Sequence, residues 1–279
     1  MFGKLLKNDL KIQFHGMYVL LFIVLVITAV AELAALFAKL GHWQNAGLIR
    51  AIGGTLAWVV LLFACFVIVG AVGVSFSKTV FGRSGYLTLT LPVKTSSLVR
   101  SKTLSGLIWV WLVYVAFLTS LFLWMMEMQD VIGEGTISAA GGVLQALGLP
   151  SFRMLGYSAG GLLVYLLAFV FLLVQCLYFG ITLANVRPFS KLGAFGAVLY
   201  FLIVFGILTG VAHYFGQLLP IGFVGTESGL VFTSDVALSA AGESIVVVRR
   251  TMDIVFEFVF AVLLHFPMTY LINKKVNVA

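Results

Sequence analysis

The sequence predicts an all-α polytopic membrane protein that forms a single transmembrane domain over residues 1–279. Apolar residues make up 62% of the chain and charged residues only 10%, whereas soluble domains contain about 25% charged residues. The apolar residues gather in runs of about 20, the length that a helix needs to cross a bilayer. A soluble fold of this length has too little interior to bury so much apolar surface, so lipid must cover most of it.

The first element, residues 1–15, is predicted to be a basic amphipathic helix that lies in the membrane interface. Apolar residues recur along it at helical spacing, and lysines occupy the other side. The apolar side includes Leu5 and Leu10, and the lysines are Lys4, Lys7 and Lys11. The alternative is an ordinary charged flank that only sets the orientation of the first span.

Six membrane spans are predicted to follow. Their approximate bounds are 17–40, 53–76, 104–126, 157–184, 192–214 and 254–272. The long connector before the last span is mildly apolar and is predicted to form short outer helices or a re-entrant segment packed on the bundle. Gly206 and Gly210, four residues apart in the fifth span, are typical of close helix packing.

The basic residues predict the orientation of these spans. Six spans place twelve of the 17 Lys and Arg residues on the side of the two termini, which leaves 17 − 12 = 5 on the other side. Basic residues favour cytoplasmic loops, so both termini are predicted to be cytoplasmic. The net charge of +7 is therefore a membrane-orientation signal, and nucleic acid is not an expected partner.

No catalytic, metal or cofactor site is predicted within the chain. Cys65 and Cys176 stand singly in apolar runs, as buried thiols do. The phosphate-binding pattern G-x4-G-K-[S/T] does not occur. The chain is therefore not expected to be an enzyme, and any ATP-driven work would be powered by another polypeptide.

The connector between the second and third spans, 77–103, is predicted to be a cytoplasmic coupling loop. Its segment Gly85–Lys102 reads GYLTLTLPVKTSSLVRSK, in which leucines alternate with Tyr and Thr until Pro92 ends the run. Three basic residues follow before the next apolar run. A simple tether would not need this pattern, so the loop is interpreted as a docking surface for a cytoplasmic partner.

Residues 84–109, SGYLTLTLPVKTSSLVRSKTLSGLIW, resemble the corresponding loop of bacterial ABC-2-type permeases, and residues 1–18, MFGKLLKNDLKIQFHGMY, resemble the opening of the same permeases. The resemblance implies a membrane-spanning permease subunit of an ATP-driven ABC transporter, an exporter of the bacterial inner membrane. The implied partners are a cytoplasmic ABC ATPase, which would carry ATP and Mg, and a second permease subunit, identical or not. The resemblance does not identify the cargo.

The entry helix and the coupling loop would then contact the ATPase. The implied loop contacts are Gly85, Tyr86, Leu87, Thr88, Leu91, Pro92 and Val93, with Arg83 and Lys94 at the rim. The chain departs from the family pattern at Arg83 and Ser84, where many relatives have an acidic residue.

Three ionisable residues fall inside predicted spans: Glu32, Glu257 and His265. Intramembrane ionisable groups are costly, so they indicate a cargo path or pairing between spans, unless they reach the interface or have a structural role. His265 precedes Pro267 by two residues, which favours a structural role at a kink. These three residues also support the alternative function, an ion-coupled secondary transporter or channel that acts without an ATPase. An intramembrane enzyme is not favoured, because no nucleophile and base are predicted at one depth.

Overall fold

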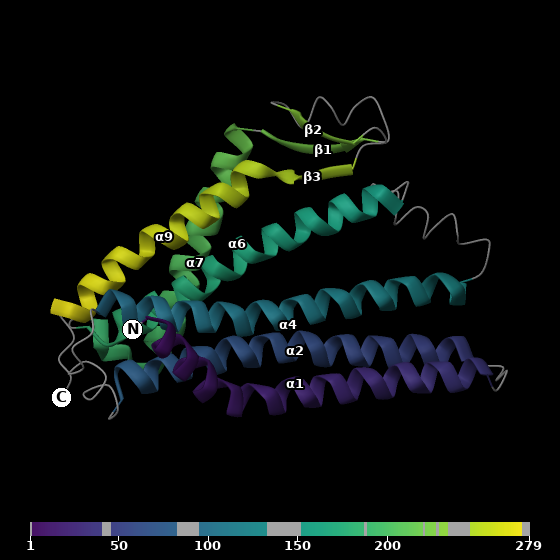
Figure 1. The fold of residues 1–279 in the computed structure, drawn as a ribbon, viewed down its shortest axis with the longest axis horizontal. Helices are drawn as coiled ribbons and strands as arrows, with labels where there is room; N and C mark the ends of the chain where they lie inside the picture. The colour runs from purple at the N-terminus through teal and green to yellow at the C-terminus, as the bar shows by residue number, and fades with distance from the viewer. Residues whose placement is uncertain are drawn as a thin grey trace.

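The computed structural model describes residues 2–40, 46–82, 95–132, 152–186, 189–219, 221–226, 229–233 and 246–274, and some side chains within these ranges, including that of Glu32, lie outside the description. The described chain is mostly helical, with long helices that run between two ends of a bundle (Figure 1). The long helices are α1 (Phe2–Leu40), α2 (Ala46–Val80), α4 (Thr95–Ile132), α6 (Phe152–Ala184), α7 (Gly193–Leu218) and α9 (Thr251–Lys274), and a short 3-10 helix, η1, covers Phe189–Leu192.

The helical, multi-pass prediction is confirmed. In the part of the chain that the structure describes, five helices are long and apolar enough to cross a membrane. They are Val59–Val80, Thr95–Phe117, Leu163–Ala184, Phe189–Leu218 and Thr251–Asn273. Large apolar side chains such as Phe63, Phe66 and Phe195 lie exposed on their outer surface, as a lipid solvent permits. The further span predicted at 17–40 falls within α1 and stays a prediction.

The helices form two groups of three. Helices α1, α2 and α4 pack against one another, as do α6, α7 and α9, and the contacts of α6 with α2 and α4 join the groups. The start of α1 and the end of α9 lie at the same end of the bundle, which we call the proximal end (Figure 1). The ends of α1 and α4 and the start of α6 lie at the opposite, distal end.

The predicted entry helix is the first part of α1, which lies at an angle to the rest of that helix (Figure 1). Its predicted lysine side is exposed, and Leu5 and Leu10 are partly buried. The buried side also carries two polar residues, Asp9 and Gln13. The apolar side of the entry helix therefore packs on protein as well as facing any lipid. Its position in the membrane interface stays a prediction.

The boundary of the predicted coupling loop is corrected. The loop was predicted over 77–103, but α2 continues to Val80 and α4 already begins at Thr95. Arg100 and Lys102 are therefore helical residues and not loop residues. Their charges suggested a loop, but the charge of Lys102 is neutralised by a partner from a distant part of the sequence. Residues 83–94, which hold every ATPase contact predicted in the loop, lie outside the described residues.

The predicted outer helices or re-entrant segment are also corrected, because the connector between α7 and α9 contains a sheet. Strands β1 (Gly222–Thr226), β2 (Gly229–Thr233) and β3 (Val246–Arg250) form an antiparallel sheet in the order β2-β1-β3. Phe223 pairs with Phe232 and Val224 with both Val231 and Val247. Such β-branched and aromatic residues favour strands, and mutual pairing satisfies their backbone groups.

The predicted packing role of Gly206 and Gly210 is not found among the residues that the structure describes. A Cβ atom at either position would meet nothing within 4 Å. The close approach between α6 and α7 occurs instead at Gly180, where a Cβ atom would lie 2.7 Å from the backbone nitrogen of Phe201 and 2.9 Å from the carbonyl oxygen of Ala197. Only a residue without a side chain allows the two backbones to come so close.

Replacing Gly180 with Ala should therefore destabilise the bundle. The added methyl group meets backbone atoms of α7, which cannot rotate away, and such overpacking costs about 1–3 kcal/mol. Thermal unfolding of the detergent-solubilised chain, followed by size-exclusion chromatography, measures the effect. Gly210→Ala is the matched control and should leave the melting temperature unchanged or slightly higher, because Ala favours a helix over Gly. Equal melting temperatures for the two variants would contradict this packing.

Candidate functional site

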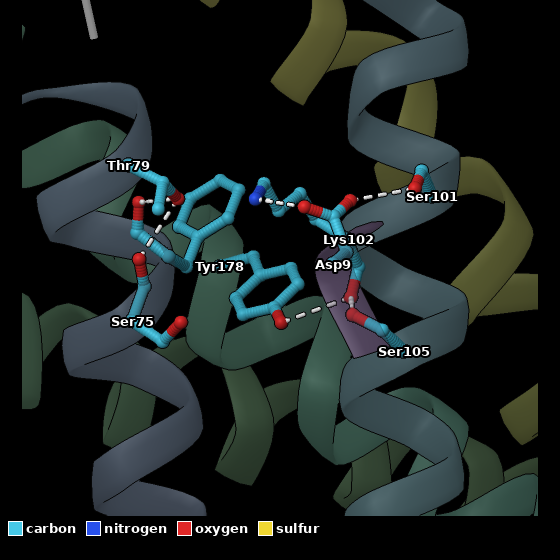
Figure 2. Close-up of polar contacts among 8 residues, drawn as sticks. Asp9, Ser75, Thr79, Ser101, Lys102, Ser105 and Tyr178 are labelled. Atoms are coloured by element: carbon cyan, nitrogen blue, oxygen red, sulfur yellow. Dashed lines mark hydrogen bonds and ion pairs between the residues drawn. The ribbon is translucent and has the colours of Figure 1, made fainter. Parts of the chain in front are cut away.

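A buried ion pair joins the first part of α1 to the start of α4. The Lys102 ammonium contacts Asp9 Oδ1, and Ser101 Oγ donates a hydrogen bond of 2.6 Å to Asp9 Oδ2 (Figure 2). The side chains of Lys102 and Asp9 are only 7% and 9% exposed. Each carboxylate oxygen thus has a donor, and a buried charge is tolerated when it is paired and hydrogen-bonded in this way.

Tyr178 of α6 connects this pair to the second helix group. Its hydroxyl donates a hydrogen bond of 3.2 Å to the carbonyl oxygen of Lys102, which also accepts one of 3.0 Å from Ser105 Oγ (Figure 2). The Tyr178 ring stacks on Phe76 of α2, with ring centroids 4.0 Å apart and ring planes 11° apart. Tyr178 is fully buried, so both of its ends are held by protein.

Local sequence explains why Tyr178 fits there. Gly106 stands one turn after Lys102 on α4, and a Cβ atom at this position would lie 2.6 Å from Tyr178 Oη and 2.9 Å from Val72 Cγ1. Glycine therefore makes room for the phenol between α4 and α2. The pair Asp9–Lys102 and the residues Ser101 and Tyr178 are called the proximal polar cluster below.

The end of α9 is tied to the first turn of α4. His265 Nε2 lies 3.2 Å from Ser96 Oγ, and Thr95 Oγ1 lies 2.5 Å from Asn273 Oδ1. His265 is buried, and α9 continues as a helix through Pro267. The structure thus places His265 at a helix contact beside the predicted coupling loop. The predicted structural role of His265 stays a prediction.

A second group of polar residues lies at the start of α9. Asp253 is buried, and its Oδ2 lies 3.9 Å from His213 Nδ1 of α7. Gly216 makes room for this carboxylate, since a Cβ atom there would overlap Asp253 Oδ1. Glu257 lies one turn further along α9 and is also buried. This acid is therefore enclosed by protein, and whether it belongs to a cargo path, pairs between spans or has an interfacial or structural role stays a prediction.

The structure brings together only part of what the sequence predicted. Lys102 contacts Asp9 of the predicted entry helix. The side chain of Glu32 and the predicted loop contacts lie outside the described residues. Asp9 and Tyr178 were missed. Asp9 is the only acid before Glu32 and stands among lysines, which was an available signal; Tyr178 had none, because its role depends on tertiary contacts.

Within the described residues, no group of three His, Cys, Asp or Glu side chains could hold a metal ion. Comparison with known proteins gave no significant match to a family model, to a curated protein sequence or to a solved structure.

Removing one partner of the buried ion pair should destabilise the protein strongly. Asp9→Ala leaves the Lys102 ammonium buried without a counter-charge, which costs about 3–5 kcal/mol. The double variant Asp9→Leu with Lys102→Met should recover most of this loss, since apolar residues of similar volume often replace a buried pair at little cost. A double-mutant cycle on thermal unfolding, with Asp9→Leu and Lys102→Met as its two single variants, measures the coupling. Lys7→Ala, at an exposed position of the same helix, is the control, and a loss as large as that of Asp9→Ala would contradict the assignment.

Tyr178→Phe should have a smaller effect. It removes one buried hydrogen bond, worth about 0.5–1.5 kcal/mol, but keeps the stacking on Phe76. Tyr200→Phe is a matched control, because Tyr200 Oη donates a bond of the same 3.2 Å length to the Phe189 carbonyl at an exposed site. Thermal unfolding should show a clear loss for Tyr178→Phe and little change for Tyr200→Phe. The reverse order would show that the Tyr178 hydroxyl does not stabilise the contact between α4 and α6.

Proposed function

We propose that the chain is the membrane-spanning permease subunit of an ATP-driven ABC transporter, an exporter that works with a separate cytoplasmic ATPase. In the working assembly, the chain would pair with a second permease subunit in the bacterial inner membrane, with both termini in the cytoplasm. The ATPase would bind ATP and Mg. The proposal rests on the sequence resemblance at residues 1–18 and 84–109 and on one structural observation.

That observation is the buried ion pair between Asp9 and Lys102. The resemblance assigns ATPase contact to two segments, the entry helix and the loop that ends just before α4. Asp9 belongs to the first segment, and Lys102 lies two turns after the end of the second. A partner that pulls on either segment would therefore move both together, because separation would leave a buried charge unpaired.

The proximal polar cluster and the contact between Ser96 and His265 offer a route from the partner to the rest of the bundle. Tyr178 joins the backbone of α4 to α6, and Ser96 joins the first turn of α4 to His265 of α9. Movement of the start of α4 would thus act on α6 and α9 directly. Such movement could open and close a path between the two helix groups while ATP is bound and hydrolysed.

A second candidate is an ion-coupled secondary transporter or channel. The observation in its favour is the buried side of α9, which carries Asp253, Glu257 and His265 at spacings of four and eight residues. Buried ionisable groups along one membrane helix often mark an ion path. Solute transport by the purified chain alone in liposomes, driven by a pH difference, would favour this candidate over the first.

The deciding experiment is affinity purification of the tagged chain from its own host in mild detergent, with and without ATP. We expect a stoichiometric ATPase to copurify. Replacing Leu91 and Pro92 with Ala should reduce its recovery by about tenfold or more, since truncating central contacts costs about 2 kcal/mol. Lys191→Gln, an exposed charge change in η1, is the control and should keep the partner. Purification of an intact, folded chain without any ATPase would contradict the proposal.

A further inference from the structure

A cavity of about 370 Å³ lies between α4 of one helix group and α6 and α9 of the other. Apolar side chains form most of its walls, namely Leu104 and Leu107 of α4, Phe171 of α6, and Val262 and Phe266 of α9. Ligand cavities in proteins usually measure about 300–1,000 Å³ and are mostly apolar. An apolar cavity of only about 150 Å³ is already large enough to bind benzene. The size and the walls of this cavity therefore suit an apolar ligand.

The polar residues around the cavity offer little to an occupant. Thr103 and Gln175 are buried, and their unpartnered atoms, Oγ1 and Oε1, have almost no accessible surface. His265 Nε2 already lies 3.2 Å from Ser96 Oγ. Arg100 is exposed, so its methylene groups can line the wall while the guanidinium stays outside. Among these residues, a water molecule in the cavity would lack the two to four polar partners that it needs.

The surroundings of the cavity identify the source of its ligand. Leu104 and Phe266 of its walls are 37% and 61% exposed, so the cavity opens to the outer surface of the bundle. Its lining residues all belong to helices that are long and apolar enough to cross a membrane, Thr95–Phe117, Leu163–Ala184 and Thr251–Asn273. Hydrocarbon covers such a surface in a bilayer. An empty cavity would forfeit the dispersion contacts of its walls, and a hydrocarbon chain that entered would restore them.

We infer that this cavity binds one hydrocarbon chain of a membrane lipid, through its apolar walls and without any contact that depends on the headgroup. The chain lies between Leu107 of α4, Phe171 of α6 and Val262 of α9. It supplies packing between the two helix groups next to the contact of Ser96 with His265. This site does not depend on the proposed function, because it requires no ATPase and would exist equally in a secondary transporter.

Photolabelling of the full chain in phosphatidylcholine nanodiscs tests the site, with a trace of phosphatidylcholine that carries a photoreactive acyl chain. Phe171 and Phe205 are both half-buried, but Phe171 lines the cavity and Phe205 does not. We expect peptide mass spectrometry to find about tenfold more label on Phe171, because only a chain inside the cavity reaches a half-buried ring. Equal labelling of the two residues would show ordinary contact with the outer surface and would overturn the site.

Filling the cavity should remove the label. Leu107→Trp places an indole in the space of the chain and should lower the labelling of Phe171 by about tenfold. Leu112→Trp is the matched control, because Leu112 is exposed on the same helix outside the cavity, and it should leave the labelling unchanged. If size-exclusion chromatography shows that Leu107→Trp does not fold, Val262→Phe fills the cavity from α9, with Val198→Phe at an exposed position of α7 as its control. Labelling that survives in the folded cavity variant, or that is lost equally in its control, would contradict the inference.

A further measurement separates the chain from its headgroup. A diacylglycerol that carries the same photoreactive chain has no phosphate, and it should label Phe171 as strongly as the phosphatidylcholine does. Both lipids present the same hydrocarbon to the apolar walls. Labelling by only one of them would show that a headgroup is recognised and would overturn the assignment to the chain alone.

Discussion

The buried pairing of Asp9 with Lys102 constrains the rest of the proximal end. Two opposite charges with almost no exposure are stable only while they remain together. The first part of α1 must therefore stay docked on α4, and α4 must present Ser101 beside Lys102 to complete the carboxylate's hydrogen bonds. The main-chain carbonyl of Lys102 accepts a hydrogen bond from the Tyr178 hydroxyl, so this one residue of α4 contacts both α1 and α6.

The contacts between helices follow from the solvent. Lipid is as apolar as a leucine side chain, so hydrophobic burial adds little to helix association within a membrane, and close packing and interhelical hydrogen bonds must do more. Close packing occurs at Gly106 and Gly180, where another residue would collide with a neighbouring helix. The stacked rings of Phe76 and Tyr178 add a large, flat contact between the two helix groups.

Composition and apolar run length predicted the helices well, because both follow directly from what a bilayer requires. Pairings between distant residues were not predictable. Arg100 and Lys102 suggested a loop, since their charges seemed unsuited to a buried helix until Asp9 was found beside Lys102. The strands β1 to β3 are rich in β-branched and aromatic residues that favour strands, but each is only five residues long and lies in a mildly apolar connector, where such short runs do not exclude a helix or a re-entrant segment. Gly206 and Gly210 had the spacing of a packing motif, yet spacing alone does not say which face a neighbouring helix covers.

The polar contacts also explain where relative movement of the two helix groups would pivot. At the proximal end, Tyr178 bonds to the backbone of α4, and His265 lies beside Ser96. Both contacts cross from one helix group to the other. Asp253 and His213, by contrast, belong to the same group and do not restrain the other one. A rotation that keeps these two contacts, among the residues that the structure describes, would therefore turn about the proximal end.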